Sequence, residues 1–325
     1  MSTKDKRNIY IFLSKVILIA LLVVFIIRCF FVEPFMVSSS QMESSLSKGD
    51  RVLVNKTSYG IRLPITLLTI PFTFDKFLGY KSYSSSLQMS CRRMLSKNVQ
   101  KNDVVLFNNP NEVEKPLDKR SLILSRCIGL PGDTVHVFNN RFTINGKEYI
   151  PSPDMMDSYS FSSRYIDTII TLLADLDIPQ RELKKKSDTI CSLLMTKYES
   201  YLLTQNFICS DSLPFFQMDT VKYHFIIPYK GMNIKLNPEN TVLYEQAIAF
   251  ETGEIAKKGK SMNPKKGKTV YKDYIFADDY YWMLSDNVTN SVDSRSIGFI
   301  PHKAVIGKAG LVWLSKDRDS FRWIN

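Results

Sequence analysis

Histidine is scarce in this sequence. The 325 residues include three histidines, His136, His224 and His302, and these stand far apart along the chain. Zinc-type sites show close Cys/His spacing, and no such cluster occurs here. We therefore interpret the three histidines as unrelated residues, and we expect neither a metal nor a cofactor.

Cysteine offers equally little chemistry. The count of five is odd, with Cys29 at the edge of an apolar run and Cys127 inside a predicted strand. Cys191 and Cys209 could pair in an oxidising compartment, but the sequence does not decide this. We interpret the cysteines as mostly structural.

Long apolar runs are also lacking, apart from one near the N-terminus. Residues 9–31 read IYIFLSKVILIALLVVFIIRCFF, with Lys15 and Arg28 as the charged members. As a helix this run spans about 34 Å, enough for a hydrocarbon core of about 30 Å. Both cations lie near the ends and can snorkel to the headgroups. We predict an uncleaved transmembrane anchor; a cleaved signal peptide is the alternative.

The charges before this run predict its orientation. Lys4, Lys6 and Arg7 outnumber Asp5, which by the positive-inside rule keeps the N-terminus cytoplasmic. We therefore expect a single-pass protein of the inner (cytoplasmic) membrane, with its main domain extracytoplasmic. The predicted parts are a cytoplasmic N-terminus (1–8), the anchor (9–31), a β core (32–150), an insertion or second subdomain with a helical pair (151–275) and a return to the β core (276–325).

Composition beyond the anchor is that of a folded domain. Hydrophobic residues make up 44% and charged residues 23%, which argues against global disorder. The net charge of +11 could favour anionic lipid headgroups, nucleic acid or nothing specific. Residues 257–272 carry seven lysines and no acid; they are either a solvated loop or a segment attracted to anionic lipid.

Short strands between turn signals dominate the predicted β core. Apolar stretches fall at Val52–Val54, within 102–110 and on both sides of the Gly-Pro-Gly turn in 122–137, and Asn145-Gly146 is a hairpin signal. This pattern predicts a mainly β fold, with a bent antiparallel domain. Residues 61–74 either pack under that domain or lie on the membrane surface, since their prolines disfavour a long helix and an inner strand.

Helical spacing appears within residues 162–206. Apolar residues recur in YIDTIITLLADLDI and again in ICSLLMTKYESYLL. We predict a two-helix insertion here, with strands resuming around Lys222–Pro228 and continuing to the C-terminus.

Three blocks in order carry a family resemblance. They are EPFMVSSSQMESSLSKGDRVLVNKTSYG after the anchor, SRCIGLPGDTV, and SDNVTNSVDSRSIGFIPHKAVIGKA from Ser285 to Ala309. In this order and spacing the chain resembles bacterial type I signal peptidases, in their Bacteroidetes-like version. These are membrane-anchored serine proteases that remove signal peptides from exported proteins. The resemblance covers nearly the whole chain, more loosely in the helical insertion.

The resemblance implies a Ser/Lys dyad, and both of its positions are substituted. Glu33-Pro34-Phe35 and Gly49-Asp50 fix the register without gaps, so that the nucleophile position falls on Gln41 and the lysine position on Ser125. A carboxamide has no ionisable oxygen nucleophile, and a serine hydroxyl cannot replace a desolvated amine as base. A hydrogen bond between Gln41 and Ser125 could satisfy both neutral groups.

The resemblance also places the supporting residues. Ser39 and Met42 match the oxyanion and groove region, and Ser285 replaces a glycine of the family pattern. The supporting residues it implies are Arg126, Asp286, Ser291, Asp293 and Arg295, the last pair as an acid–base brace. Val288 and Thr289 stand where the family has Arg-Asp. Gly129, Pro131, Gly132 and Asp133 supply the turn after the strand that carries Ser125.

Three functions compete on these grounds. The first is a non-catalytic homologue that binds signal peptides or preproteins, or assists an active signal peptidase paralogue. The second is an active peptidase that uses Ser39, Ser40 or Ser44, although Ser40 on an extended segment would point to the opposite face. The third is a structural or lipid-associated envelope protein. Membrane lipids are expected partners, and nucleic acid is not.

Overall fold

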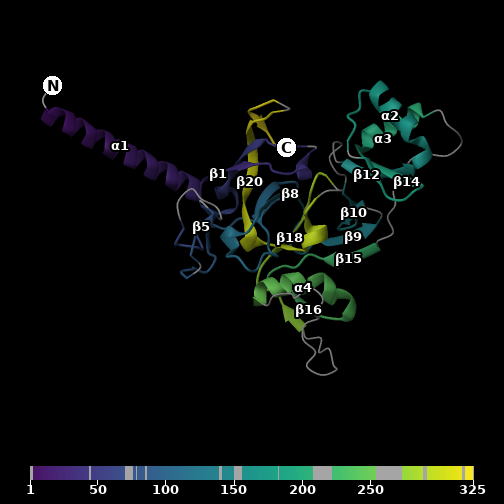
Figure 1. Ribbon diagram of the computed structural model, residues 1–325. Coiled ribbons are helices and arrows are strands. Elements are labelled where there is room, and N and C mark those ends of the chain that lie inside the picture. The colour runs from purple at the N-terminus through teal and green to yellow at the C-terminus, as the bar shows by residue number, and fades with distance from the viewer. Residues whose placement is uncertain are drawn as a thin grey trace.

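The computed structural model describes residues 3–43, 45–69, 76–77, 79–84, 86–138, 141–149, 156–181, 183–207, 222–253, 273–287, 291–316 and 319–324. Its first element is helix α1 (Thr3–Phe30), which projects from the body in Figure 1. Tyr10–Phe30 has a mean hydropathy of 2.9 and is not buried against the rest of the chain. Within the described residues this is the one helix long and apolar enough to cross a membrane, as the sequence predicts.

A curled antiparallel sheet forms the body and confirms the mainly β prediction. Its central strand, β20 (Val305–Leu314), pairs with β2 and β7 and also with the C-terminal β21 (Arg322–Trp323). The path through the sheet is β1 (Val32–Met36), β2 (Arg51–Asn55), β20, β7 (Val104–Asn108), β8 (Leu122–Gly129), β18 (Tyr280–Leu284) and β19 (Ile300–Pro301).

The predicted turn after β8 is confirmed. β8 ends at Gly129 and β9 (Thr134–Phe138) begins five residues later. Asp133 closes the turn by accepting the Leu130 N–H at 2.9 Å, and Gly132 adopts φ +86°, where a side chain would be strained. β9 lies in a second sheet ordered β11 (Lys147–Glu148), β10 (Arg141–Ile144), β9 and β15 (Lys222–Ile226), whose β10–β11 turn is the predicted Asn145-Gly146 hairpin.

The insertion contains helices, but half of the second predicted helix is a strand. α2 (Ile166–Asp175) matches its prediction, whereas ICSLLMT forms β14 (Ile190–Thr196) between β12 (Met156–Ser162) and β13 (Leu183–Lys185). β14 is buried over its five central residues because it is the middle strand of three. A short continuous apolar run does not distinguish a strand from a helix by periodicity. Helix α3 (Lys197–Asn206) starts only after Thr196, whose capping box with Glu199 sets the boundary.

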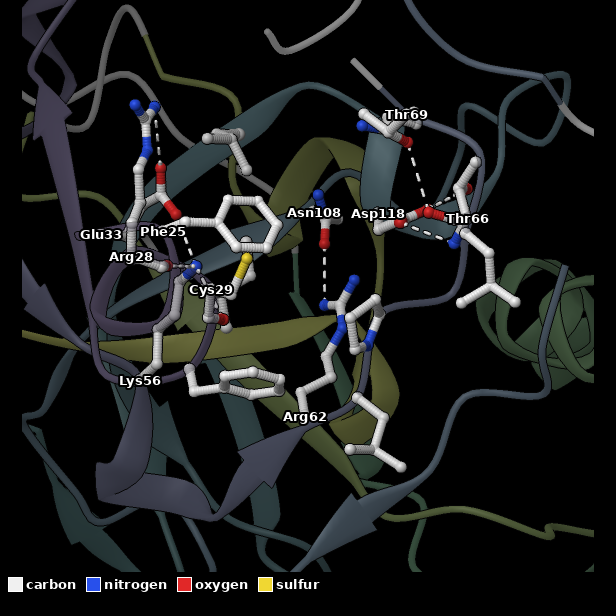
Figure 2. Close-up of a pocket in the computed structure, with 17 residues that line it drawn as sticks. Phe25, Arg28, Cys29, Glu33, Lys56, Arg62, Thr66, Thr69, Asn108 and Asp118 are labelled. Atoms are coloured by element: carbon white, nitrogen blue, oxygen red, sulfur yellow. Dashed lines mark hydrogen bonds and ion pairs between the residues drawn. The ribbon is translucent and has the colours of Figure 1, made fainter. Parts of the chain in front are cut away.

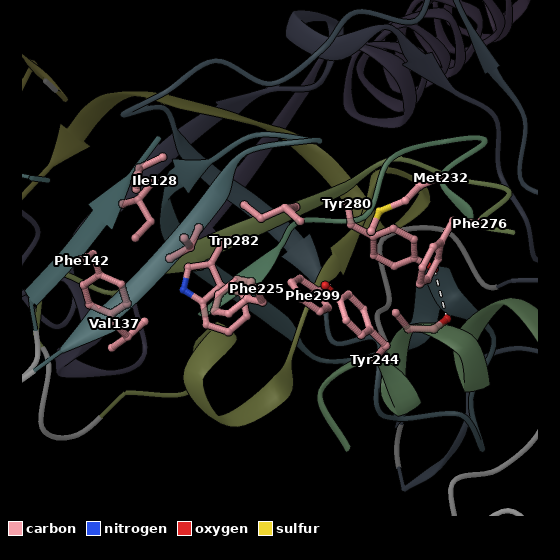
Figure 3. Close-up of a cluster of buried hydrophobic side chains, with 14 of the residues drawn as sticks. Ile128, Val137, Phe142, Phe225, Met232, Tyr244, Phe276, Tyr280, Trp282 and Phe299 are labelled. Atoms are coloured by element: carbon pink, nitrogen blue, oxygen red, sulfur yellow. Dashed lines mark hydrogen bonds between the residues drawn. The ribbon is translucent and has the colours of Figure 1, made fainter. Parts of the chain in front are cut away.

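A second difference is helix α4 (Pro238–Thr252), in a region where the sequence predicts strands. Asn237 and Asn240 cap each other's backbone N–H groups at 2.7 and 2.8 Å, and Gly253 ends the helix in the left-handed region. Tyr244, Ala247 and Ile248 of α4 are buried in an aromatic cluster on the sheet (Figure 3). Trp282, Phe225, Phe276, Phe299 and Tyr280 belong to that cluster.

Small two-stranded sheets complete the body. They are β3 (Ile61–Arg62) with β6 (Arg93–Met94), β4 (Lys76–Phe77) with β5 (Tyr80–Lys81), and β16 (Asn233–Lys235) with β17 (Asp273–Ile275). Within residues 61–69, Ile65 is buried, as packing under the domain predicts, while Leu67 and Leu68 are exposed; contact of this segment with the membrane surface stays a prediction. The lysine-rich segment 257–272, Cys209, and Val288 with Thr289 lie outside the described residues.

Candidate functional site

Gln41 lies in a short 3₁₀ helix, η1 (Ser40–Met42), that follows the first strand. Ser39 caps its start in an extended conformation, without a side-chain capping bond. Consecutive residues of a 3₁₀ helix are rotated by a third of a turn. The expectation that Ser40 points opposite to Gln41, as on an extended segment, is therefore wrong. Ser44 lies outside the described residues.

Met42 anchors η1 to the core. Its side chain is 1% exposed and packs in a cluster with Val37, Leu46 and Leu124. The cluster joins the segment that carries Gln41 to the strand that carries Ser125, since Leu124 belongs to β8. A contact of Met42 or Ser39 with a peptide stays a prediction.

Ser125 is fully buried on β8, and its partner is not the one predicted. Its hydroxyl oxygen lies 3.2 Å from that of Ser285, at the end of β18. Among the described residues no hydrogen bond joins Ser125 to Gln41, and the half-buried Gln41 carboxamide makes none to a protein group. The predicted Gln41–Ser125 bond is wrong because Ser285, which replaces a family glycine, supplies the nearer hydroxyl.

Asn287 ties η1 to the end of β18. The Asn287 N–H donates to the Gln41 carbonyl at 2.9 Å, and its side-chain amide donates to the Ser40 carbonyl at 3.2 Å and to the Glu43 carboxylate at 3.4 Å. These bonds fix the backbone of the predicted nucleophile position.

Asp286, the neighbouring residue, pairs with Arg126 in a bidentate ion pair. The guanidinium donates Nε–H and Nη2–H to the two carboxylate oxygens at 3.0 Å each, and both side chains are buried. Burial opposes the charged form of Arg126, but the hydrogen bonds and charge of Asp286 outweigh it and hold the pKa above its ordinary value. The Ser45 hydroxyl also bonds to Asp286 and accepts from Arg126.

Asp293 forms the centre of the predicted brace. Its side chain is 1% exposed and accepts the Ser285 N–H at 3.0 Å, the Ser291 hydroxyl at 3.0 Å and the Arg295 guanidinium at 2.6 Å. It also caps helix α5 (Ser294–Ile297). Ser291 accepts from Arg295 at 2.7 Å, so that the serine matched to the family's lysine-orienting residue bonds within the brace.

The structure brings Gln41, Ser125 and the supporting residues into one region. In the described part of the chain, no lysine donates a hydrogen bond to Ser39, Ser40 or Ser125. The described charges of this region include the pairs Arg126–Asp286 and Arg295–Asp293, besides the Glu43 carboxylate. Among the described residues, Ser125 bonds to another hydroxyl, and Ser45 and Ser291 bond to the carboxylates of Asp286 and Asp293.

Sequence reasoning missed a hydroxyl–imidazole pair elsewhere. The Ser96 hydroxyl lies 3.0 Å from Nε2 of His302, whose Nδ1 lies 3.0 Å from the Tyr281 hydroxyl. Burial and the nearby charge of Arg93 lower the pKa of His302 to about 4. The same surroundings disfavour the imidazolium that proton transfer from Ser96 would create, so this is a poor catalytic dyad. No local motif signals a pair separated by about two hundred residues.

Two of the three histidines are neighbours, which corrects their interpretation as unrelated residues. His136 and His224 are cross-strand partners on β9 and β15, and their rings stack with centroids 5.6 Å apart. Strand pairing joins them, which sequence distance conceals. Within the described residues, no group of three or more His, Cys, Asp or Glu side chains could hold a metal ion.

Comparisons with known proteins agree with the three sequence blocks. Residues 11–188 and 225–314 match the family model described as "Signal peptidase, peptidase S26". Signal peptidase I of Buchnera aphidicola subsp. Schizaphis graminum is 26% identical over 302 residues, covering 93% of this chain and 74% of that protein. Signal peptidase I of Haemophilus influenzae is 26% identical over 310 residues, covering 93% and 69%.

A solved structure also matches. Signal peptidase I of Enterococcus faecalis has 16% sequence identity and a TM-score of 0.25, covering 65% of this chain and 97% of that chain. The family model itself spans well over half of the 325 residues. The chain belongs to the signal peptidase family, peptidase S26.

Proposed function

We propose that this protein is a non-catalytic member of the signal peptide processing system, which binds signal peptides or preproteins, or assists an active paralogue, without cutting them. The observation that carries the proposal is the pair of residues at the dyad positions, Gln41 and Ser125. Membership of the signal peptidase family supports the substrate class.

The chemistry at these positions supports loss of catalysis. Acyl transfer needs an oxygen or sulfur nucleophile and a group that accepts its proton. Gln41 offers a carboxamide, and the buried Ser125 hydroxyl bonds to another hydroxyl, that of Ser285. A charged lysine would cost desolvation energy in such a place, whereas two hydroxyls satisfy each other.

The fold has strand edges to which a peptide could add as a further strand. In the described residues, β1 pairs only with β2, and residues 122–125 of β8 pair only with β7. Phe35 of β1 and Leu122 of β8 pack against the same core cluster. An extended peptide could therefore pair with the edge of β1 or of β8 and contact both Phe35 and Leu122.

The direction of the backbone groups identifies the open positions on β8. Cys127 exchanges backbone hydrogen bonds with Asn102 and Asp103, on the β7 side, at 2.7 and 2.8 Å. Strand groups alternate in direction, so the odd residues of β8 bond toward β7 and the even residues face the other way. Arg126 accordingly pairs with β18, and the N–H and C=O groups of Leu122 and Leu124 face the unpaired edge.

The membrane setting follows from α1. One N-terminal apolar helix and family membership are consistent with a single-pass inner-membrane protein. We extend this to a cytoplasmic N-terminus and an extracytoplasmic β domain, because Lys4, Lys6 and Arg7 precede the helix. The domain would then meet signal peptides on the side where they emerge.

A paired cleavage and binding assay tests the proposal. Full-length protein in detergent micelles is incubated with a preprotein, with the Haemophilus influenzae enzyme as positive control. We expect no mature product, but saturable binding of a fluorescent signal peptide by anisotropy. Cleavage by the wild-type protein that survives purification and is lost in Ser39→Ala or Ser40→Ala would overturn the proposal.

A matched pair of variants tests the binding mode. Leu122→Pro removes an N–H that faces the open edge, while Leu122→Val keeps it and leaves a β-favouring side chain. We expect the proline variant to bind signal peptide at least about tenfold more weakly, a loss equivalent to one or two backbone hydrogen bonds. Equal affinities for two folded variants would exclude addition at this edge.

A further inference from the structure

A cavity of about 400 Å³ lies where the anchor helix meets the β domain. Figure 2 shows Phe25, Arg28 and Cys29 of the helix end on one side, with Thr66 and Asp118 on the other. Arg62 and Asn108 lie between these two walls (Figure 2). Neither Gln41 nor Ser125 lines the cavity, but Leu122, at the β8 edge proposed for peptide binding, does.

The position of the cavity along α1 places it at the level of lipid headgroups. Phe25 lies five residues before the end of the helix, which corresponds to about 7.5 Å along its axis. Each headgroup layer of a bilayer is about 5–8 Å thick, so the cavity spans the boundary between hydrocarbon and water. Leu67, which lines the cavity, and the adjacent Leu68 are 47% and 51% exposed and extend the apolar surface of the helix.

The charged side chains of the cavity are mostly cationic. Four of them are basic and two are acidic: Arg28, Lys56, Arg62, Lys119, Glu33 and Asp118. Glu33 is already paired, with the Lys56 amine at 2.6 Å and the Arg28 guanidinium at 3.9 Å. Asp118 accepts from the N–H and the hydroxyl of Thr66 at 2.9 and 2.8 Å. Four bases against two acids leave a formal surplus of two positive charges, shared between the Arg28–Lys56–Glu33 group and the group of Arg62, Lys119 and Asp118.

Arg62 holds part of this positive charge, and it lies between the two walls of the cavity, at a place called the cavity floor below. Its guanidinium donates to the Asn108 amide oxygen at 2.9 Å and to the Ala304 carbonyl at 3.5 Å, both neutral acceptors. No carboxylate of the described residues lies within 4.0 Å of it. Burial lowers the pKa of Arg62, and the nearby charge of Asp118 offsets this only in part. An anion in the cavity would supply the remaining compensation.

We propose that this cavity binds the phosphate of an anionic glycerophospholipid, with Arg62 as the residue that contacts the phosphate oxygens. A guanidinium forms bidentate hydrogen bonds to phosphate and is less strongly hydrated than an amine. Phe25, Phe30 and Leu67 line the membrane side and suit the glycerol backbone and the first acyl carbons. A soluble phosphate would use the cationic floor but gain nothing from this apolar wall.

Lys56 joins the end of α1 to the β domain beside the cavity. Its amine caps the end of α1 by donating to the carbonyls of Arg28 and Cys29 at 2.8 and 3.4 Å, besides pairing with Glu33. This clamp fixes the helix end against the β domain. A lipid seated beside the clamp would hold the domain at a set height above the bilayer.

Native mass spectrometry of the full-length protein tests the site. The protein in detergent micelles is titrated with dioleoyl phosphatidylglycerol or with dioleoyl phosphatidylcholine. We expect the first lipid to bind at least tenfold more tightly, with that preference reduced about tenfold in Arg62→Gln and largely kept in Arg62→Lys. Lys147→Gln, an exposed change of the same charge on the β10–β11 hairpin, should leave the preference unchanged.

Two further measurements keep the outcome decisive. A photoreactive phosphatidylglycerol should label wild-type residues 61–69, even if Arg62→Gln fails to fold. Millimolar inorganic phosphate should not compete. Labelling confined to other segments, equal loss of preference in Lys147→Gln, or displacement of the lipid by inorganic phosphate would each overturn the proposal.

Discussion

The predicted dyad positions and the acid–base pairs beside them differ in charge. The buried Asp293 accepts from Arg295, the Ser291 hydroxyl and the Ser285 N–H, and the buried Asp286 pairs with Arg126. At the dyad positions, neutral groups stand instead. The acid–base pairs keep charges whose burial costs desolvation energy, whereas the predicted dyad positions carry no charge.

The difference teaches which parts of the site the fold needs. A buried carboxylate holds its place only while its donors remain, and removing one partner leaves an uncompensated charge. Asp293 binds the backbone of Ser285 and caps α5, so it shapes the chain whether or not catalysis occurs. A catalytic lysine has no such architectural role, so under the proposed function Ser125 at the predicted lysine position leaves the frame intact.

Restoring the dyad gives the largest expected effect and would break the comparison. Gln41→Ser with Ser125→Lys supplies both groups, but the new lysine stem would meet the Ser285 hydroxyl, which lies 3.2 Å from that of Ser125. The triple variant with Ser285→Gly should therefore cleave a preprotein on the order of 10³-fold faster than wild type. Product formation is followed by gel densitometry.

The double variant is the control for this experiment. It should recover less activity than the triple variant, since only the latter clears space for the amine. A pH profile that rises as an amine deprotonates would identify lysine as the base. Inactivity of a well-folded triple variant would mean that the groove, and not only the dyad, has changed.

Breaking the brace gives the next largest effect. Asp293→Ala leaves Arg295 without its carboxylate and removes acceptors from the Ser285 N–H and the Ser291 hydroxyl. We expect a loss of about 3–5 kcal/mol in the free energy of unfolding. Guanidinium titration in micelles measures it.

Asp188→Ala provides the matched control. Its side chain is 99% exposed and pairs only with Lys185, so its removal should not change the midpoint measurably. Similar midpoints for the two alanine variants would contradict the idea that the brace holds the site together.

How far the sequence predicts this site depends on the range of the contacts. The anchor, the turn after β8 and the Asn145-Gly146 hairpin rest on local patterns, and the structure has them. Ser125 and Ser285 are 160 residues apart, and only strand pairing between β8 and β18 makes them partners. No local rule predicts that pairing.

The prediction of helices is limited in the same way, because local patterns do not register long-range packing. The run ICSLLMT becomes β14 because β12 and β13 pair with both of its edges and its apolar side chains pack in a cluster with those of α2 and α3, a tertiary effect that periodicity does not register. Helix α4 did have local signals, in the mutual caps of Asn237 and Asn240 and in Gly253, but its weak amphipathic pattern hid them. Capping residues would have predicted this helix better than apolar spacing.

Acid should weaken the His302 region moderately. The folded pKa of about 4 lies below the ordinary 6.5, so the unfolded chain binds the proton more tightly. This contribution to stability is present above pH 6.5 and is lost as the pH falls toward 4, by about 1–3 kcal/mol. His302→Gln should flatten the unfolding profile between these values, whereas His224→Gln, at an exposed position, should leave it as in wild type. A wild-type profile that is level over this range would contradict the effect.

The smallest effect concerns the two hydroxyls that now occupy the base position. Ser125→Ala and Ser285→Ala each leave one buried hydroxyl without its partner, at about 1–2 kcal/mol. The double alanine variant leaves none, so it should lie within about 0.5 kcal/mol of wild type, and the cycle should show a coupling of at least about 1.5 kcal/mol. Additive single costs would mean that water reaches both oxygens. A position that water reaches would not lower the pKa of a lysine by desolvation, so the same cycle indicates whether an amine placed at residue 125 could act as a base.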